Sequence, residues 1–106
     1  MVKRGEVWLV NLDPTLGSEI QKTRPCVVVS PPEMHDYLKT LLIAPMTTGN
    51  KPAPFRISIT FQNKKGLILL DQMRSIDKLR LVKKVGNLPT QTLARTLLVL
   101  QEVFAE

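Results

Sequence analysis

Short apolar runs separated by turn residues make up most of the chain and predict a set of β-strands. Proline, glycine and asparagine bound the runs, and these residues end regular elements. The expected strands cover residues 6–12, 25–30, 40–46, 55–61, 66–76 and 81–88. One of them alternates apolar and polar positions, with Phe55, Ile57, Ile59 and Phe61 on one face, as in a half-exposed strand. Strands at this spacing are typical of a small barrel or a curled sheet.

The hydrophobic period lengthens after Pro89 and predicts a C-terminal helix over residues 90–104. Apolar residues recur there at helical spacing, at Leu93, Leu97, Leu100 and Phe104. This apolar stripe is expected to pack over the sheet, and Thr90 or Thr92 is expected to cap the helix start. A short helical turn is also predicted at 32–38. The predicted fold class is therefore mainly β, of the α+β type.

The chain length of 106 residues suits a single domain, over residues 1–106, with one core. Hydrophobic residues make up 43% of the sequence, enough to form that core. No apolar run approaches the roughly 18 residues of a membrane span, and the N-terminus lacks the apolar segment of a secretion signal. We therefore expect a cytoplasmic protein that makes no membrane contact.

Cysteine and histidine each occur once, which excludes a cysteine/histidine zinc site within one chain. Cys26 lies in an apolar run and is expected to be a small buried hydrophobic residue. His35 lies in a connection between strands and is expected to be solvated. The phosphate-binding and zinc-protease motifs do not occur. We expect no cofactor and no metal.

The net charge of +6 is concentrated in the second half of the chain. Residues 1–53 carry six basic and five acidic side chains, against nine and four in residues 54–106. Seven of the basic residues lie between Lys64 and Lys84. A basic surface attracts polyanions, of which nucleic acid is the commonest. A solvated lysine-rich face explains the charge equally well.

Polar groups at strand ends are the strongest candidates for chemistry. Arg24 lies directly before one predicted strand, and Thr47 and Thr48 lie at the end of the next. If these two strands run antiparallel as neighbours, Arg24 and Thr47 come together, with Ser18 and Glu19 in the preceding loop. An arginine, a hydroxyl and a carboxylate around one concavity suit a phosphate. Arg24 could equally form a loop-fixing ion pair with Glu19, and the two roles are compatible.

The same groups suit attack by a ribose 2′-hydroxyl on its own phosphodiester. That reaction needs a base, stabilisation of the charge on the phosphorane and a proton for the leaving oxygen. It needs no metal. Pro25 and the rigid strand would hold Arg24 in place as a preorganised cation.

Four short motifs resemble the MazF/PemK/Kid family of toxins from bacterial toxin–antitoxin pairs. They are "RGEVWLVNLDPTLGSE", "TRPCVVVS", "APMTTG" and "DQMRSID", in this order. The resemblance implies a small SH3-like barrel of the PemK/CcdB type with a C-terminal helix, assembled as a homodimer. It implies a metal-independent endoribonuclease that cuts single-stranded mRNA and leaves a 2′,3′-cyclic phosphate and a 5′-hydroxyl. It also implies an antitoxin partner whose acidic tail blocks the site.

The resemblance also assigns roles to residues. Arg24 matches the family's catalytic arginine, Thr47 its catalytic threonine, Glu19 a proposed base, and Asp71 a catalytic aspartate proposed in the Kid branch. That branch has a histidine at the position of Ser18 and an arginine at the position of Leu69, so its acid–base assignment does not transfer whole. The expected RNA-binding residues are Thr48, Ser18, Lys22, Gln72, Lys64 and Lys65. Sequence specificity is expected in the loops around 14–23 and 49–55.

Two alternatives belong to other functional classes. CcdB-type toxins share the barrel but bind DNA gyrase and catalyse nothing, and fold alone does not separate them from nucleases. The other alternative is an inactive RNA-binding regulator. The arginine of "TRP" together with "PMTT" favours the nuclease.

Overall fold

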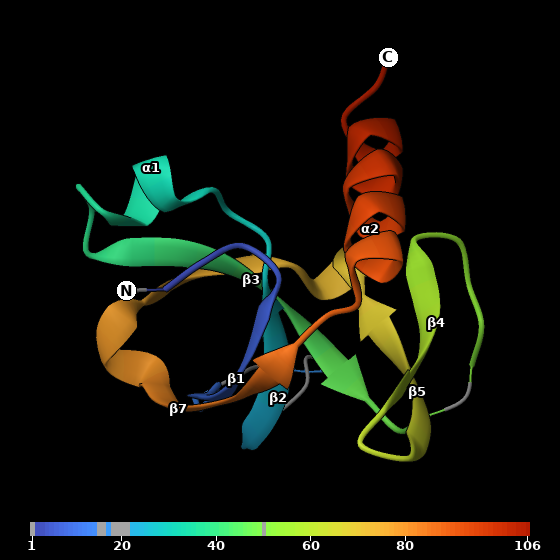
Figure 1. Ribbon diagram of the computed structural model, residues 1–106, viewed down its shortest axis with the longest axis horizontal. Coiled ribbons are helices and arrows are strands. Elements are labelled where there is room, and N and C mark those ends of the chain that lie inside the picture. The colour runs from blue at the N-terminus through green and yellow to red at the C-terminus, as the bar shows by residue number, and fades with distance from the viewer. Residues whose placement is uncertain (1, 15–16, 18–21, 50) are drawn as a thin grey trace.

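The computed structural model describes residues 2–14, 17, 22–49 and 51–106. Its elements form a curled antiparallel sheet with a helix rising from one end at the C-terminus (Figure 1). The strands are β1 (Glu6–Asn11), β2 (Thr23–Val28), β3 (Thr40–Thr47), β4 (Arg56–Phe61), β5 (Lys64–Leu69), β6 (Arg74–Asp77) and β7 (Leu81–Asn87). The helices are α1 (Pro32–His35), the 3₁₀ turns η1 (Leu70–Gln72) and η2 (Lys78–Arg80), and α2 (Thr90–Val103).

The sheet runs in the order β4-β5-β3-β2-β1-β7, and β6 pairs with β3 beside this path. Its strands curl into a half-barrel whose two outer strands approach one another at the β4–β5 turn. There the side-chain amide of Gln62 donates to the Val85 carbonyl on β7, over 3.2 Å. The predicted mainly β fold with a C-terminal helix is confirmed. None of the helices that the structure describes is long and apolar enough to cross a membrane.

Two clusters of buried side chains pack against the curled sheet. Both form because successive residues of a strand point to opposite faces of the sheet. The first gathers Val7, Val27, Val29, Ala44, Met46, Ile57, Ile68, Leu70 and Leu88. The second gathers Val10, Leu12, Cys26, Val28, Leu41, Ile43 and Ile76. Helix α2 packs on the first cluster through Leu93, Val99 and Leu100. Both clusters take residues from β2 and β3, so these two central strands are held rigidly.

The single strand predicted over 66–76 is wrong, because the chain forms β5 and β6 with η1 between them. Both strands pair with β3, β5 through Ile68 opposite Met46 and β6 through Arg74 opposite Ile43. On β3, two residues lie between Ile43 and Met46. Five residues lie between their partners, Ile68 and Arg74. The three extra residues form the 3₁₀ turn. Pro45 lies in this gap and has no N–H to donate to a ladder.

Three local expectations for side chains are also wrong. Phe55 lies before β4 with a φ of 66° and is exposed, so it does not share the inward face of that strand. Pro89 occupies the N-cap position of α2, and no side chain caps the helix there. Phe104 ends the helix and is 72% exposed, because α2 extends past the edge of the cluster on which Leu93 and Leu100 pack.

His35 is buried, contrary to the expectation of a solvated loop residue. One ring nitrogen lies 2.6 Å from the Val2 carbonyl and the other 3.3 Å from the Ser30 hydroxyl. Because a carbonyl can only accept, Nε2 donates to the Val2 carbonyl. Cys26 is buried as predicted, and burial raises the pKa of its thiol to about 12. This thiol is therefore unreactive near neutral pH.

A buried carboxylate joins the start of β1 to β7. Glu6 accepts from the Lys3 amide and the Trp8 indole, both at 3.0 Å, and pairs with Lys84 at 3.1 Å. Burial opposes the charge on Glu6, but these hydrogen bonds and the lysine outweigh it and hold its pKa below the usual range. A lowered pKa in the folded state means that Glu6 stabilises the fold above its unfolded value of about 4.3. That contribution is lost as the pH falls through the folded pKa.

We therefore expect Glu6→Gln to lower the free energy of unfolding at pH 7 by about 1.5–3 kcal/mol, the usual range for hydrogen bonds to a charged group. The difference between the variant and the wild type should shrink as the pH falls below the unfolded pKa of about 4.3. Urea unfolding at pH 7 and pH 3.5 measures both values, with Glu33→Gln on the exposed surface of α1 as the control. A difference that is the same at both pH values would contradict the role of the charge.

Candidate functional site

Arg24 and Thr47 come together because β2 and β3 are antiparallel neighbours, as the sequence predicted. Cys26 lies opposite Pro45 in this pair. Extending the register by two residues sets Arg24 opposite Thr47, since the sum of opposing residue numbers is constant in an antiparallel ladder. Strand β2 begins at Thr23, two residues earlier than expected, so Arg24 lies inside the strand and not before it. Its backbone is fixed further by pairing with Val10 of β1.

The Thr47 hydroxyl is oriented by the turn that follows β3. Its oxygen accepts the Gly49 amide over 3.0 Å. A threonine hydroxyl has one hydrogen to donate. Because the Gly49 contact uses an acceptor position, that hydrogen stays available to a ligand. Thr47 is thus preset as a hydrogen-bond donor at the strand end.

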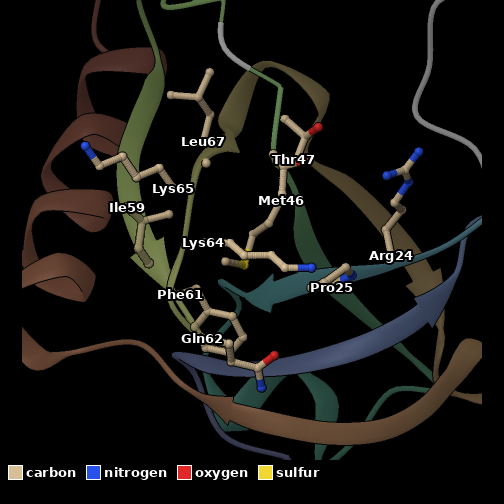
Figure 2. Close-up of a pocket in the computed structure, with 12 residues that line it drawn as sticks. Arg24, Pro25, Met46, Thr47, Ile59, Phe61, Gln62, Lys64, Lys65 and Leu67 are labelled. Atoms are coloured by element: carbon tan, nitrogen blue, oxygen red, sulfur yellow. The ribbon is translucent and has the colours of Figure 1, made fainter.

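Arg24 and Thr47 line one pocket of about 330 Å³. Figure 2 shows its side chains, which come from the ends of β2 and β3 and from the β4–β5 hairpin. The full lining is Arg24, Pro25, Met46, Thr47, Thr48, Ile59, Phe61, Gln62, Lys64, Lys65, Gly66 and Leu67. Apolar side chains provide much of the wall, and three cationic residues stand around it. Such a pocket suits a ligand that is partly apolar and carries negative charge.

Gly66 sets how closely β5 approaches the end of β3. A Cβ at this position would lie well inside contact distance of the Thr47 carbonyl oxygen and 3.1 Å from the Thr47 carbonyl carbon. It would also lie 3.5 Å from Thr48 Cα. All three atoms are backbone, so a side chain at 66 would displace the strand end that carries the hydroxyl. Gly66 is a positioning residue for Thr47.

The basic residues between Lys64 and Lys84 divide into two groups. Lys64 and Lys65 line the pocket, and their contact with RNA stays a prediction. Four of the other five hold the fold together: Arg74 donates to the Leu12 carbonyl, Lys78 to the His35 carbonyl, Arg80 to the Asn11 and Asp13 carbonyls, and Lys84 pairs with Glu6. The charge of this segment therefore serves both structure and the pocket.

Asp71 does not line the Arg24/Thr47 pocket. Both of its carboxylate oxygens accept from Arg56, over 3.1 and 2.9 Å. The hydrogen bonds that Arg56 donates to Asp71 raise the pKa of Arg56. Arg56 also donates to the Lys51 carbonyl, so the pair ties the loop before β4 to η1. Gln72 lies in η1 and is likewise absent from the pocket lining.

Lys22 closes the base of the loop between β1 and β2. Its amide donates to the Asp13 carboxylate over 2.9 Å, and its carbonyl accepts the Leu12 amide over 3.0 Å. Ser18 and Glu19 lie outside the described residues, and so does the predicted Glu19–Arg24 contact. Most of the 14–23 loop, one of the two expected specificity loops, lies outside them as well.

Apart from Lys64 and Lys65, the pocket residues that the β4–β5 hairpin contributes were not predicted from the sequence. Ile59, Phe61, Gln62, Gly66 and Leu67 all line the pocket. The sequence did carry one signal, the alternation of apolar and polar residues that ends at Phe61. An apolar face on this strand has to pack against another part of the molecule. The close approach of β5 to β3 that brings the hairpin to Arg24 had no local signal.

Comparison with known proteins places the chain in a family. A family model described as "PemK-like, MazF-like toxin of type II toxin-antitoxin system" matches residues 3–104. The chain therefore belongs to this toxin family. It is 36% identical over 94 residues to Endoribonuclease PemK of Escherichia coli, covering 83% of this chain and 71% of that protein. It is 34% identical over 91 residues to Endoribonuclease MazF of Staphylococcus epidermidis, covering 80% and 76%.

Solved structures agree in fold. The crystal structure of MazF from Deinococcus radiodurans has a TM-score of 0.84 and 25% sequence identity, covering 96% of this chain and 94% of that one. An endoribonuclease from a mycobacterial species, solved in complex with its cognate antitoxin, has a TM-score of 0.80 and covers 96% and 93%. At 16% identity, that second likeness concerns the fold alone.

Proposed function

We propose that this chain is a sequence-specific, metal-independent endoribonuclease that cleaves single-stranded mRNA, the toxin of a toxin–antitoxin pair that inhibits translation and growth. The observation that carries the proposal is the meeting of Arg24 and Thr47 at one pocket, by the antiparallel pairing of β2 and β3. Membership of the toxin family and the names of the two relatives support it. Those names also favour a nuclease over a non-catalytic gyrase-binding toxin.

In the proposed reaction the ribose 2′-oxygen attacks the adjacent phosphorus. The new P–O2′ bond forms as the P–O5′ bond breaks, and the leaving 5′-oxygen takes a proton from solvent. The products are a 2′,3′-cyclic phosphate and a 5′-hydroxyl. Arg24 stabilises the charge that grows on the phosphorane oxygens, and the Thr47 hydroxyl donates to one of them. Arginine stays protonated under these conditions, so we assign Arg24 an electrostatic role and not the transfer of a proton.

The proton transfer from the 2′-hydroxyl needs a base. On the family resemblance we propose Glu19 as the base that takes the 2′-hydroxyl proton. Asp71 is engaged by Arg56 at both oxygens, so we propose that it acts here by fixing the segment beside the pocket. Thr48, Lys64 and Lys65 line the pocket and are proposed RNA contacts. Lys22 and Gln72 remain proposed contacts outside it. Ser18, which is not among the described residues, remains a proposed contact as well.

We further propose that the protein works as a homodimer in the cytoplasm and that an acidic antitoxin segment inhibits it. The net charge of +6 and the lysines at the pocket give a positive field that would attract RNA and an acidic tail alike. Related folds have been solved together with antitoxins: the mycobacterial endoribonuclease with its cognate antitoxin and MazE–MazF of Deinococcus radiodurans. RNA and inhibitor would then compete for overlapping surface.

Incubation of the purified protein with long single-stranded RNA in EDTA tests the proposed activity. We expect cleavage in EDTA at the rate seen with Mg²⁺, because the proposed charge stabilisation comes from side chains. A double-stranded RNA of the same sequence is the control and should resist. Cleavage that stops in EDTA and returns with Mg²⁺ would contradict the mechanism, and intact RNA under both conditions would favour a binding protein.

A further inference from the structure

The backbone conformation at position 62 does not favour glutamine. The role of Gln62 must therefore come from its side chain. Gln62 forms the two-residue turn between β4 and β5 with Asn63, and both have positive φ, 51° and 64°. Turns of this kind favour glycine, asparagine or aspartate, and a glutamine there is strained. Strained positions of this type cluster at functional sites.

The Gln62 amide is held in one orientation. Its Nε2 donates to the Val85 carbonyl over 3.2 Å. A carbonyl only accepts, so the nitrogen must face Val85 and the oxygen must face away from it. In Figure 2 the amide nitrogen points away from Lys64 and the amide oxygen lies on the Lys64 side. Gln62 therefore presents a fixed hydrogen-bond acceptor at the pocket.

An aromatic ring lies directly beside this acceptor. Phe61 lines the pocket with Ile59 and Met46. A Cβ on Gly86 would lie 2.9 Å from the ring atom Cζ, so the bare backbone of β7 supports the ring at close range. Aromatic rings stack with the unpaired bases of single-stranded RNA, and nearby polar groups read the base edge.

Resting on the RNA cleavage proposed above, we propose that Phe61 and Gln62 form a nucleobase subsite for one nucleotide that flanks the cut phosphate. The Phe61 ring and its apolar neighbours take the face of the base. The Gln62 oxygen accepts from an exocyclic amino group on the base edge, as in adenine or cytosine. Lys64 follows on the same hairpin and would contact the phosphate of that nucleotide.

The inference is tested by sequencing the cut sites of wild type and Gln62 variants in a pool of random single-stranded RNA. We expect the wild type to prefer bases with an exocyclic amino group over uracil by about 10-fold at one position beside the cut, a factor that corresponds to one favourable hydrogen bond. Gln62→Leu and Gln62→Gly should reduce that preference to less than about 3-fold and leave other positions unchanged. Gln91→Leu, on the exposed start of α2, is the matched control and should keep the full preference.

Two further readouts separate base reading from a purely structural role. Gln62→Gly relieves the positive φ, so its melting temperature should fall less than that of Gln62→Leu while its specificity is lost equally. An oligonucleotide with purine riboside in place of a preferred adenine lacks only the amino group and should be cut about 10-fold more slowly by wild type alone. A wild type that cuts RNA with a preference unchanged in both variants would overturn the subsite. A wild type that cuts no RNA would overturn the activity itself.

Discussion

Replacing Arg24 with alanine should lower kcat/KM for single-stranded RNA by about 10²–10³-fold, or roughly 2.7–4 kcal/mol of barrier, by analogy with the loss of one preorganised donor to a developing oxyanion. The guanidinium lies on a strand paired on both sides, so the charge is held where the phosphorane forms. The loss should fall mainly on kcat, since the charge on phosphorus grows in the transition state. Single-turnover cleavage of a defined oligonucleotide measures it.

Arg24→Lys and Arg95→Ala are the matched variants. Lysine keeps the charge but loses the two-pronged geometry, so Arg24→Lys should lie between alanine and wild type. Arg95 is exposed on α2, and its removal changes net charge equally without touching the pocket. A folded Arg24→Ala protein that cuts within a few-fold of the wild-type rate would show that the arginine has a structural role only.

Adding one methyl group at Gly66 should cost about 10²-fold in kcat although the residue contributes no side chain. The new Cβ would press on the backbone of Thr47 and Thr48, and a displacement of about 1 Å in a catalytic group has an effect of this size. The crowding should also lower the free energy of unfolding by about 1–3 kcal/mol. Cleavage rates and urea unfolding of Gly66→Ala give both values.

A second variant separates misplacement of Thr47 from loss of stability. Ile76→Val removes one methyl group from the other core cluster and should cost about 0.5–1.5 kcal/mol. It should leave kcat within a few-fold of wild type at a temperature where both variants are folded. If Gly66→Ala retains wild-type kcat, the close approach of β5 does not position the hydroxyl.

Local patterns predicted the elements whose partners are near in sequence or fixed by periodicity. The apolar runs gave β1, β2, β3, β4 and β7, and the change of period after Pro89 gave α2. The break between β5 and β6 could not be predicted in this way. It arises because the segment between β5 and β6 has three more residues than the stretch of β3 that it faces. That stretch lies more than 20 positions earlier in the chain. The burial of His35 likewise depends on Val2, which lies 33 residues away.

The candidate site was predictable where it follows from strand register. Arg24 lies near the start of β2 and Thr47 at the end of the neighbouring β3, so antiparallel pairing is enough to join them. The motif around Asp71 suggested a catalytic role for it. Its partner Arg56 lies 15 residues away on β4, and no local pattern predicts that pair. Gly66 and the Gln62 amide depend on the packing of β5 on β3 and of the hairpin on β7. No periodicity in the chain encodes these contacts.

The chemistry of the cut ends tests the central claim most directly. An RNA oligonucleotide cleaved by the protein in EDTA should give a 2′,3′-cyclic phosphate on one fragment and a 5′-hydroxyl on the other, as resolved by mass spectrometry. A single 2′-deoxy substitution at the nucleotide before the cut should abolish cleavage, because it removes the attacking oxygen. Fragments with a 3′-hydroxyl and a 5′-phosphate, or undiminished cutting at the deoxy position, would contradict it.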